Sequence, residues 1–240
     1  MADTNTTNFG LVKVEVGASQ NTWGAKLNTN MDDVDKVALG YYAVGGTANA
    51  ITITTGLSLA SIPVGMQVCF VASANNTSST TINVDGTGAV TCKTITKVNL
   101  PADYIDTDFF TVARYTGANW IVDRQIERGS NANGSYVRFA DGTQICRTET
   151  NQAVRVSASR MAYSWTFPAA FIDSNSSLSA MLPGASGSYT IVTLPEVGPL
   201  NATGFGTTSV SAGFSHSQAG SFAVGSTIDN IRFQAIGLWY

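Results

Sequence analysis

The stretch SNANGSYVRFADGTQICRTE, residues 130–149, decides the fold of the second half of the chain. It holds two short runs with strand-forming residues, Tyr136–Phe139 and Gln144–Arg147, on either side of Asp141 and Gly142. An Asp-Gly pair between two such runs is typical of a β-hairpin with a two-residue primed turn. We therefore predict a hairpin here, and we predict that the preceding ERGSNAN, residues 127–133, is a linker leading into it.

Short strand-forming runs continue from the hairpin to residue 240. They are SWTF at 164–167, YTIVTL at 189–194, SVSAGFSH at 209–216 and NIRFQAIGLWY at 230–240. Because segments rich in Gly, Ser and Asn separate them, residues 128–240 are predicted to form a small β domain. The large aromatic residues of this part alternate with small ones, which favours a role in the core. These residues are Trp165, Phe167, Phe171 and Trp239.

Residues 45–127 show the same pattern upstream of the predicted linker. The strand-forming runs here are ITITT, MQVCFVASA, TTINVDG, VTCKTI and DFFTVARY. None of the segments between them has a helical period long enough for the crossover of a parallel βαβ unit. We therefore predict a fold that is mainly β, with two successive antiparallel β domains after a short N-terminal strand and helix.

Residues 1–44 carry that strand and helix. The alternating run Phe9–Val16 predicts a short strand. Apolar residues then recur at spacings of 4, 4, 3 and 4, forming a single helical stripe of Trp23, Leu27, Met31, Val34 and Ala38. Asn21 or Thr22 can cap the start of this helix, and Gly40 suits a left-handed residue at its end.

A helix with one narrow apolar stripe needs another surface to cover that stripe. We favour a second copy of the chain or a docking protein, and so assign Trp23, Leu27, Met31 and Val34 to docking or oligomerisation. The alternative is a helix that lies on the β domain of its own chain.

Composition excludes several classes of partner. Only 12% of the 240 residues are charged, the formal net charge is -3, and the 13 basic residues are scattered singly. This balance argues against a nucleic-acid partner, which needs clustered Lys and Arg. No apolar run approaches the roughly 18 residues of a membrane span, so we expect no membrane insertion. Residues 1–10 lack the basic and apolar regions of a secretory signal, and we expect synthesis and folding in the bacterial cytoplasm.

The residues needed for catalysis or metal binding do not form a recognisable pattern. His216 is the single histidine and no GxSxG nucleophile motif accompanies it, so a catalytic triad is not indicated. The three cysteines, Cys69, Cys92 and Cys146, lack the spacing of a zinc site, and we expect free thiols. We therefore expect no enzyme activity, no metal and no cofactor.

Three successive segments resemble parts of phage tail fibres. NTWGAKLNTN, residues 21–30, resembles the N-terminal segment by which many tail fibres attach to the virion. GGTANAITITTG (45–56), NVDGTGA (83–89) and YTGANWIVD (115–123) are similar to the β module repeated in fibre shafts. Asn133-Gly134, Tyr136, FADGTQI (139–145), WTFPAAF (165–171) and AIGLWY (235–240) resemble a fibre tip domain.

This resemblance to the phage tail-fibre or receptor-binding spike family implies a homotrimer, intertwined or packed along the fibre, that resides on a virion. It implies three parts: 1–44 attaches to a tail or head protein of the particle, 45–127 is a shaft module, and 128–240 is the tip. The receptor would be a host-surface polysaccharide or outer-membrane component. Two alternatives stay open: a structural adaptor that carries another binding protein, and a surface-glycan hydrolase, which would use a pair of carboxylates.

Candidate receptor-binding residues lie in predicted loops, because binding groups gather on loops held by a rigid sheet. Tyr189 in SGSYT offers an aromatic face, and His216, Ser217 and Gln218 offer hydrogen-bonding groups of the kind that sugars use.

Overall fold

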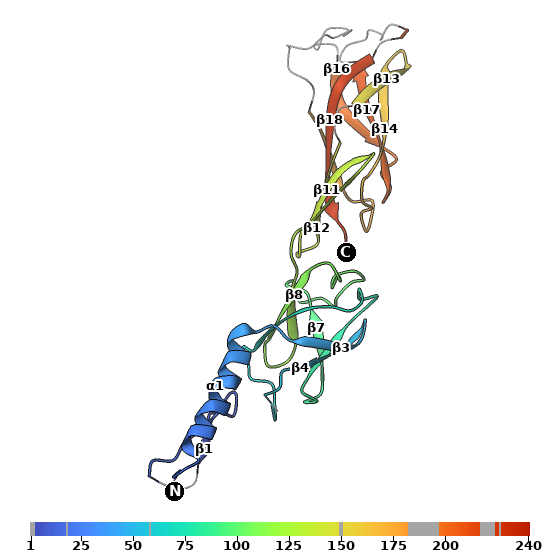
Figure 1. The fold of residues 1–240 in the computed structure, drawn as a ribbon. Coiled ribbons are helices and arrows are strands. Elements are labelled where there is room, and N and C mark those ends of the chain that lie inside the picture. The colour runs from blue at the N-terminus through green and yellow to red at the C-terminus, as the bar shows by residue number, and fades with distance from the viewer. Residues whose placement is uncertain are drawn as a thin grey trace. The chain divides into compact units, whose positions relative to one another are not determined.

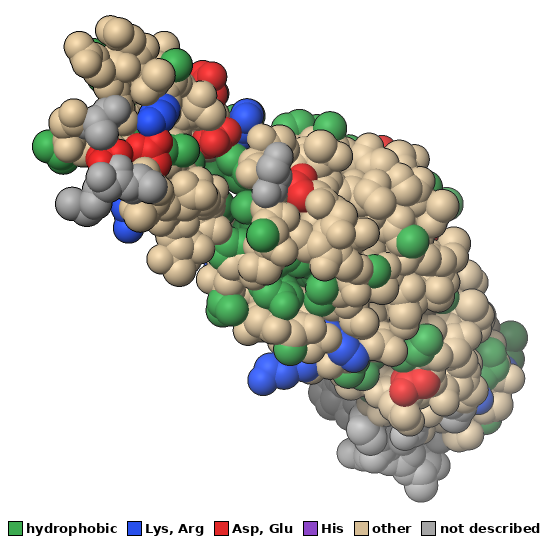
Figure 2. Space-filling view, turned by 90° about the horizontal axis from the view of Figure 1, so that it is seen from below, with side chains coloured by type: hydrophobic (Ala, Val, Ile, Leu, Met, Phe, Trp, Pro, Cys, Tyr) green, Lys and Arg blue, Asp and Glu red, His purple; other side chains and the backbone are tan. Residues whose placement is uncertain are grey.

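The structure, a computed structural model, describes residues 3–17, 19–57, 59–148, 151–181, 197–216, 224–225 and 227–240. The chain divides into two compact units, Met1–Gln125 and Ile126–Tyr240 (Figure 1). Both are built mainly from strands, which confirms the predicted fold class. Charged side chains are sparse on the visible surface (Figure 2). Within the described residues, no helix has the length and apolar character needed to cross a membrane.

The first unit begins with a small hairpin and a helix. Strands β1 (Thr4–Asn5) and β2 (Val12–Lys13) pair antiparallel, so the predicted strand over Phe9–Val16 is reduced to the two residues of β2. Helix α1 spans Trp23–Leu39 and ends as predicted, because Gly40 adopts φ 62° and its N–H donates to the Lys36 carbonyl. Thr22 is the N-cap residue, but its side chain makes no capping hydrogen bond.

The remaining strands of this unit form one seven-stranded sheet. They are β3 (Ala43–Thr47), β4 (Ala50–Thr54), β5 (Gln67–Val71), β6 (Thr81–Val84), β7 (Ala89–Lys93), β8 (Phe110–Tyr115) and β9 (Trp120–Asp123). Their order in the sheet is β3-β4-β6-β7-β9-β8-β5. A parallel bridge joins Tyr41, just before β3, to Cys69 in β5, so the two ends of the sheet meet.

The prediction of a purely antiparallel first domain is wrong at two ladders. β4 pairs with β6 in parallel, with Ile51 opposite Ile82, and β7 pairs with β9 in parallel, with Cys92 opposite Trp120. A parallel pair needs a crossover, and a helix is its usual form. Here the chain between β4 and β6 contains β5, and the chain between β7 and β9 contains β8. Because neither connection is a helix, no helical period in the sequence indicates a parallel pair.

Alternation along these strands places one set of side chains inside the curved sheet. The inward residues are almost fully buried, and they are Ile51, Ile53, Val68, Phe70, Ile82, Val84, Trp120 and Val122. The polar side chain of Asn76 is also fully buried, and its amide donates to the carbonyls of Ser78 and Pro101 at 2.9 and 2.7 Å. These bonds satisfy the buried amide and fix the loop before β8.

The second unit is antiparallel throughout its described ladders. Its strands are β10 (Glu127–Asn131), β11 (Gly134–Arg138), β12 (Thr143–Arg147), β13 (Asn151–Ser157), β14 (Arg160–Thr166), β15 (Ser177–Met181), β16 (Val197–Thr203), β17 (Ser209–His216) and β18 (Thr227–Leu238). Their order is β10-β11-β12-β18-β13-β14-β17-β16, and β15 pairs with β18.

The hairpin predicted from residues 130–149 is confirmed as β11 and β12, but its surroundings differ from the prediction. The supposed linker, residues 127–133, contains β10, which pairs with β11 along its whole length. Asn131 lies opposite Gly134, so Ala132 and Asn133 form a tight turn. Gly134 has φ 130°, and a Cβ on it would lie 2.0 Å from the Arg147 carbonyl oxygen, so this position requires glycine.

The turn between β11 and β12 is also longer than the two residues predicted. Phe139 N–H donates to the Thr143 carbonyl at 2.9 Å, which leaves Ala140, Asp141 and Gly142 in the loop. Gly142 has φ 97° and Asp141 accepts a hydrogen bond from the Thr143 N–H. A three-residue loop with glycine at the left-handed position is the next commonest hairpin connection, and the same Asp-Gly pair satisfies it.

Strand β18 holds the second unit together. Its first half pairs with β13, and its second half pairs with β12 and β15. Phe233 at its centre is buried, and its ring stacks on Tyr163 at 5.6 Å and lies 6.3 Å from both Trp165 and Phe214. The predicted core role of Trp165, Phe167, Phe171 and Trp239 is confirmed, since all four are buried.

We expect the Phe233→Ala variant to lose about 3–5 kcal/mol of unfolding free energy, because it removes the ring at the centre of the core. Ile236→Ala on the opposite face of the same strand is the matched control, since Ile236 is 39% exposed. It should cost about 1 kcal/mol or less. Urea unfolding followed by tryptophan fluorescence measures both, and equal losses would contradict the central role of Phe233.

Candidate functional site

Helix α1 turns its polar side toward its own chain. Asn30 accepts a hydrogen bond from the Val12 N–H at 2.8 Å and donates to the Val12 carbonyl at 2.7 Å, so it binds β2 as a strand neighbour would. Lys26 forms an ion pair with Asp3. Lys36 donates to the Gly56 carbonyl at 3.1 Å and to Asp33 at 3.0 Å. The helix and the β1–β2 hairpin therefore lie side by side through polar contacts (Figure 1).

The predicted apolar stripe faces away from the chain. The exposed fractions are 60% for Trp23, 45% for Leu27, 60% for Met31 and 44% for Val34, and the helix has no buried residue. The alternative that this stripe packs on its own β domain is therefore wrong. The usual arrangement of a surface helix, with its apolar side inward, is reversed here.

The ion pair between Lys26 and Asp3 at the start of the helix affects the pKa of Asp3. The hydrogen bond from Lys26 is the main cause that lowers the pKa of Asp3, and the Glu15 N–H adds to it. The lowered pKa means that Asp3 holds its charge, and with it the contact with Lys26, to a more acidic pH than an ordinary aspartate would. Because this pair lies at the surface, its contribution to stability is small.

The residues predicted to bind a receptor are not placed by the structure. Tyr189, Ser217 and Gln218 lie outside the described residues. His216 is the last residue of β17, where its backbone pairs with Val197, but its side chain is outside what the structure describes. Their role stays a prediction from the sequence.

The described residues hold no group of three or more His, Cys, Asp or Glu that would suit a metal ion. The three cysteines are free: Cys69 is partly exposed, whereas Cys92 and Cys146 are buried. Burial raises the pKa of the Cys92 thiol to about 12, and burial also raises that of Cys146. Since the thiolate is the reactive form, these two buried cysteines are unsuited to act as nucleophiles at neutral pH.

Sequence reasoning missed one hollowed surface on the second unit. A hollow of about 590 Å³ lies against β10, β11 and β12 and is lined by Arg128, Ser135 and Arg147 among others. A second hollow of about 430 Å³ shares Ser135 and Arg147 with the first and extends to Arg232. No local sequence motif predicts this surface, because its residues come from strands that are far apart in the sequence.

No protein-family model matches the sequence, and no curated protein matches it. Among solved structures, a C-terminal fragment of the P. aeruginosa R1 pyocin fibre is similar to 48% of this chain at 14% identity, with a TM-score of 0.33. An N-truncated R1-type pyocin tail fibre is similar to 46% of the chain at 15% identity, with a TM-score of 0.31. The matched part spans 28% of the first fibre structure and 85% of the second.

We expect the three thiols to differ in reactivity in the folded protein at pH 8. Cys69 should react first with a thiol reagent because it is partly exposed, while Cys92 should stay protonated and protected because its pKa is about 12. All three should react after denaturation without a reducing agent. Mass spectrometry of the labelled peptides measures this, and native labelling of Cys92 as fast as Cys69 would contradict the burial.

Proposed function

We propose that the chain is a fibre or spike protein of a phage or phage-like particle, attached to the particle through its N-terminal segment. The observation that carries the proposal is the exposed stripe of Trp23, Leu27, Met31 and Val34 on a helix whose polar residues already bind its own chain. Such a surface suits an interface with other chains. Trp23 and Leu27 lie within residues 21–30, which resemble the virion-attachment part of tail fibres.

We further propose that the second unit binds a receptor on the host surface. Its buried aromatic core provides a rigid support for loops and sheet surfaces, which is the usual arrangement of a binding domain. The hairpin of β11 and β12 and the closing strand β18 carry the residues that resemble a fibre tip. Modest affinity at one site becomes firm attachment when several copies on one particle act together.

A homotrimer is the assembly that we propose for this protein. The stripe on α1 would pack against its copies, and the edge strands β10 and β16 of the second unit would be covered as well. No catalysis is part of the proposal.

Assembly is tested by replacing two stripe residues with charged ones. Sedimentation should give three times the 25.1 kDa mass of the chain for the wild type and a smaller assembly for Leu27→Asp with Met31→Asp, because carboxylates cannot be buried without partners. The melting of the β units should not change, since both residues are exposed. Ala25→Asp with Asn28→Asp adds the same charge to the helix outside the stripe and should leave the mass unchanged. A monomeric wild type at micromolar concentration would contradict the trimer.

Receptor binding is tested with the labelled full-length protein on a panel of bacterial strains. We expect saturable attachment to some strains, and we expect the protein to block adsorption of the particle that carries it. Tyr189→Ala and His216→Ala should reduce attachment without lowering the melting temperature, because Tyr189 is predicted to lie in a loop and His216 is the last residue of its strand. Attachment to no strain would favour the adaptor alternative, in which another protein binds the host.

A further inference from the structure

The outer face of one half of the second unit is defined by strand register. Across four neighbouring strands, Arg128, Val137, Ile145 and Ile236 lie opposite one another in a row. The next row contains Ser130, Ser135, Arg147 and Gln234. Because side chains alternate along a strand, these rows point away from the core that Cys146, Phe233 and Ala235 fill from the other side.

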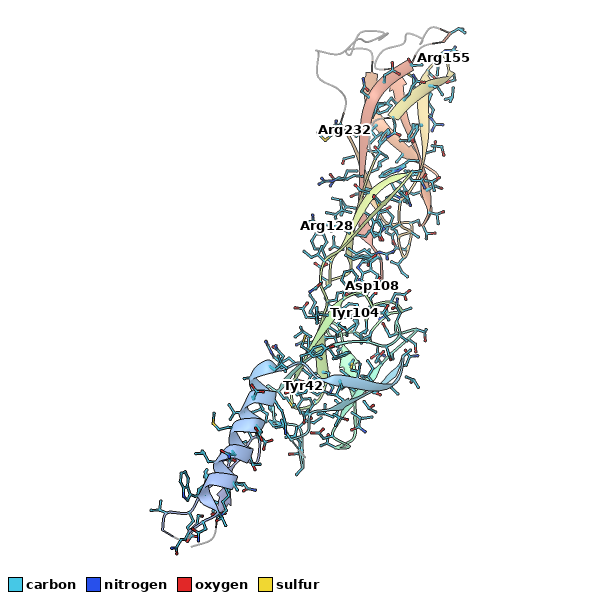
Figure 3. All side chains as sticks on the ribbon, viewed as in Figure 1. Tyr42, Tyr104, Asp108, Arg128, Arg155 and Arg232 are labelled. Atoms are coloured by element: carbon cyan, nitrogen blue, oxygen red, sulfur yellow. The ribbon has the colours of Figure 1, made fainter. Side chains whose placement is uncertain are left out.

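Three arginines cross this outer face on a diagonal. Arg128 is on β10 in the first row and Arg147 is on β12 in the second row. Ideal strand spacing and rise per residue place their Cα atoms about 12 Å apart. Arg232 lies on β18 one row further, about 8 Å from Arg147. All three are exposed, and Figure 3 shows Arg128 and Arg232 on the same side of the unit. The hollows of about 590 and 430 Å³ lie between successive arginines and share Arg147.

These arginines differ from Arg138, which stabilises the fold. Arg138 pairs with Glu127 at 3.4 Å, donates to Gln144 at 2.8 Å and lies over the rings of Tyr136 and Trp239. By contrast, no ion pair joins Arg128, Arg147 or Arg232 to a carboxylate among the described residues. A row of guanidinium groups that pair with no described carboxylate is suited to an anionic ligand, because each presents several donors to a carboxylate, phosphate or sulfate.

We propose that this face, formed by Arg128, Arg147 and Arg232 and the two hollows between them, binds an anionic glycan. Its acidic groups bind the arginines, its hydroxyls bind Ser130 and Ser135, and the apolar faces of its sugar rings lie on Val137, Ile145 and Ile236. The inference rests on the proposed function and names the chemical class of the receptor. It adds a site on the sheet to the residues Tyr189 and His216 that the sequence predicts for receptor binding.

A second copy of the chain is the other occupant to consider, because arginine with aliphatic residues also suits a protein interface. Charge complementarity favours the glycan. The described carboxylates of this unit are separate and most are already engaged: Glu127 with Arg138, Asp173 with Asn175, and Asp229 with Gln152. No described acidic surface of this unit therefore matches three arginines in a row.

The test measures binding of the full-length protein to dextran sulfate, polygalacturonate and neutral dextran by calorimetry, at low and moderate salt. We expect binding of at least one of the two acidic glycans, weaker at higher salt, and none of dextran. The two acidic probes distinguish sulfate-like groups from carboxylates. Arg147→Gln should weaken binding about tenfold to a hundredfold, because it removes charged hydrogen bonds shared by both hollows. Arg147→Lys, which keeps the charge, should bind more tightly than Arg147→Gln.

Arg155→Gln is the matched control, since it makes the same change of charge on β13, away from the face (Figure 3). It should bind as the wild type does, and melting temperatures verify that each variant is folded. Equal weakening by Arg155→Gln and Arg147→Gln would overturn the proposal in favour of general charge attraction. Binding of dextran as tight as that of the acidic glycans, or binding of no probe, would overturn it too. A changed sedimentation mass of Arg147→Gln without changed glycan binding would assign the face to an interface between copies.

Attachment of the same variants to bacterial cells separates this inference from the proposed function. If the wild type and Arg147→Gln attach equally well, the arginine face is not the receptor site and the proposed function stands. If the wild type attaches to no strain, the proposed function fails, and the glycan titrations alone decide whether the face binds acidic sugars.

Discussion

The second unit depends on the burial of one side of β18. Phe233 and Ala235 must point into the core, where Phe233 meets Tyr163, Trp165 and Phe214. Since a strand alternates, this burial forces Arg232, Gln234 and Ile236 to the opposite face. The register with β12 then places Arg147 beside Gln234, and β11 brings Arg128 into the neighbouring row. The arginine face is thus a consequence of the core, and a shift of one residue in β18 would bury Arg232 and abolish both.

Local signals in the sequence predicted local structure well. The stripe and Gly40 predicted α1, and the alternating runs predicted β4 to β8, β11, β12, β17 and β18. The errors arose where pairing is not local. The polar segment 127–131 has the composition of a linker, yet it forms β10 because β11 offers it a complete set of backbone partners. The parallel ladders of the first unit join strands separated by another strand, and no local pattern encodes which strands become neighbours.

The arginine face could not be predicted from the sequence for the same reason: its residues become neighbours only through strand pairing. In the sequence the Lys and Arg residues are scattered singly, so no basic segment points to this surface. Strand pairing gathers three of them on one face from β10, β12 and β18. Composition also bears on this surface, because residues 126–240 contain arginine but no lysine. A chain that needs only solubility has no reason to avoid lysine, whereas planar recognition of oxoanions favours arginine.

The helix shows why exposed apolar surface and weak local stability belong together. Most helical stability in proteins comes from packing of an apolar face, and α1 has no buried side chain to stabilise it. Its contacts with its own chain include hydrogen bonds of Asn30 and Lys36, each contributing about 1 kcal/mol, and a surface ion pair of Lys26, which contributes little. Covering Trp23, Leu27, Met31 and Val34 would instead contribute about 1.5–3 kcal/mol per fully buried aliphatic or methionine side chain. The polar contacts set the orientation of the helix. The larger contribution to its stability would come from the surface that covers the stripe.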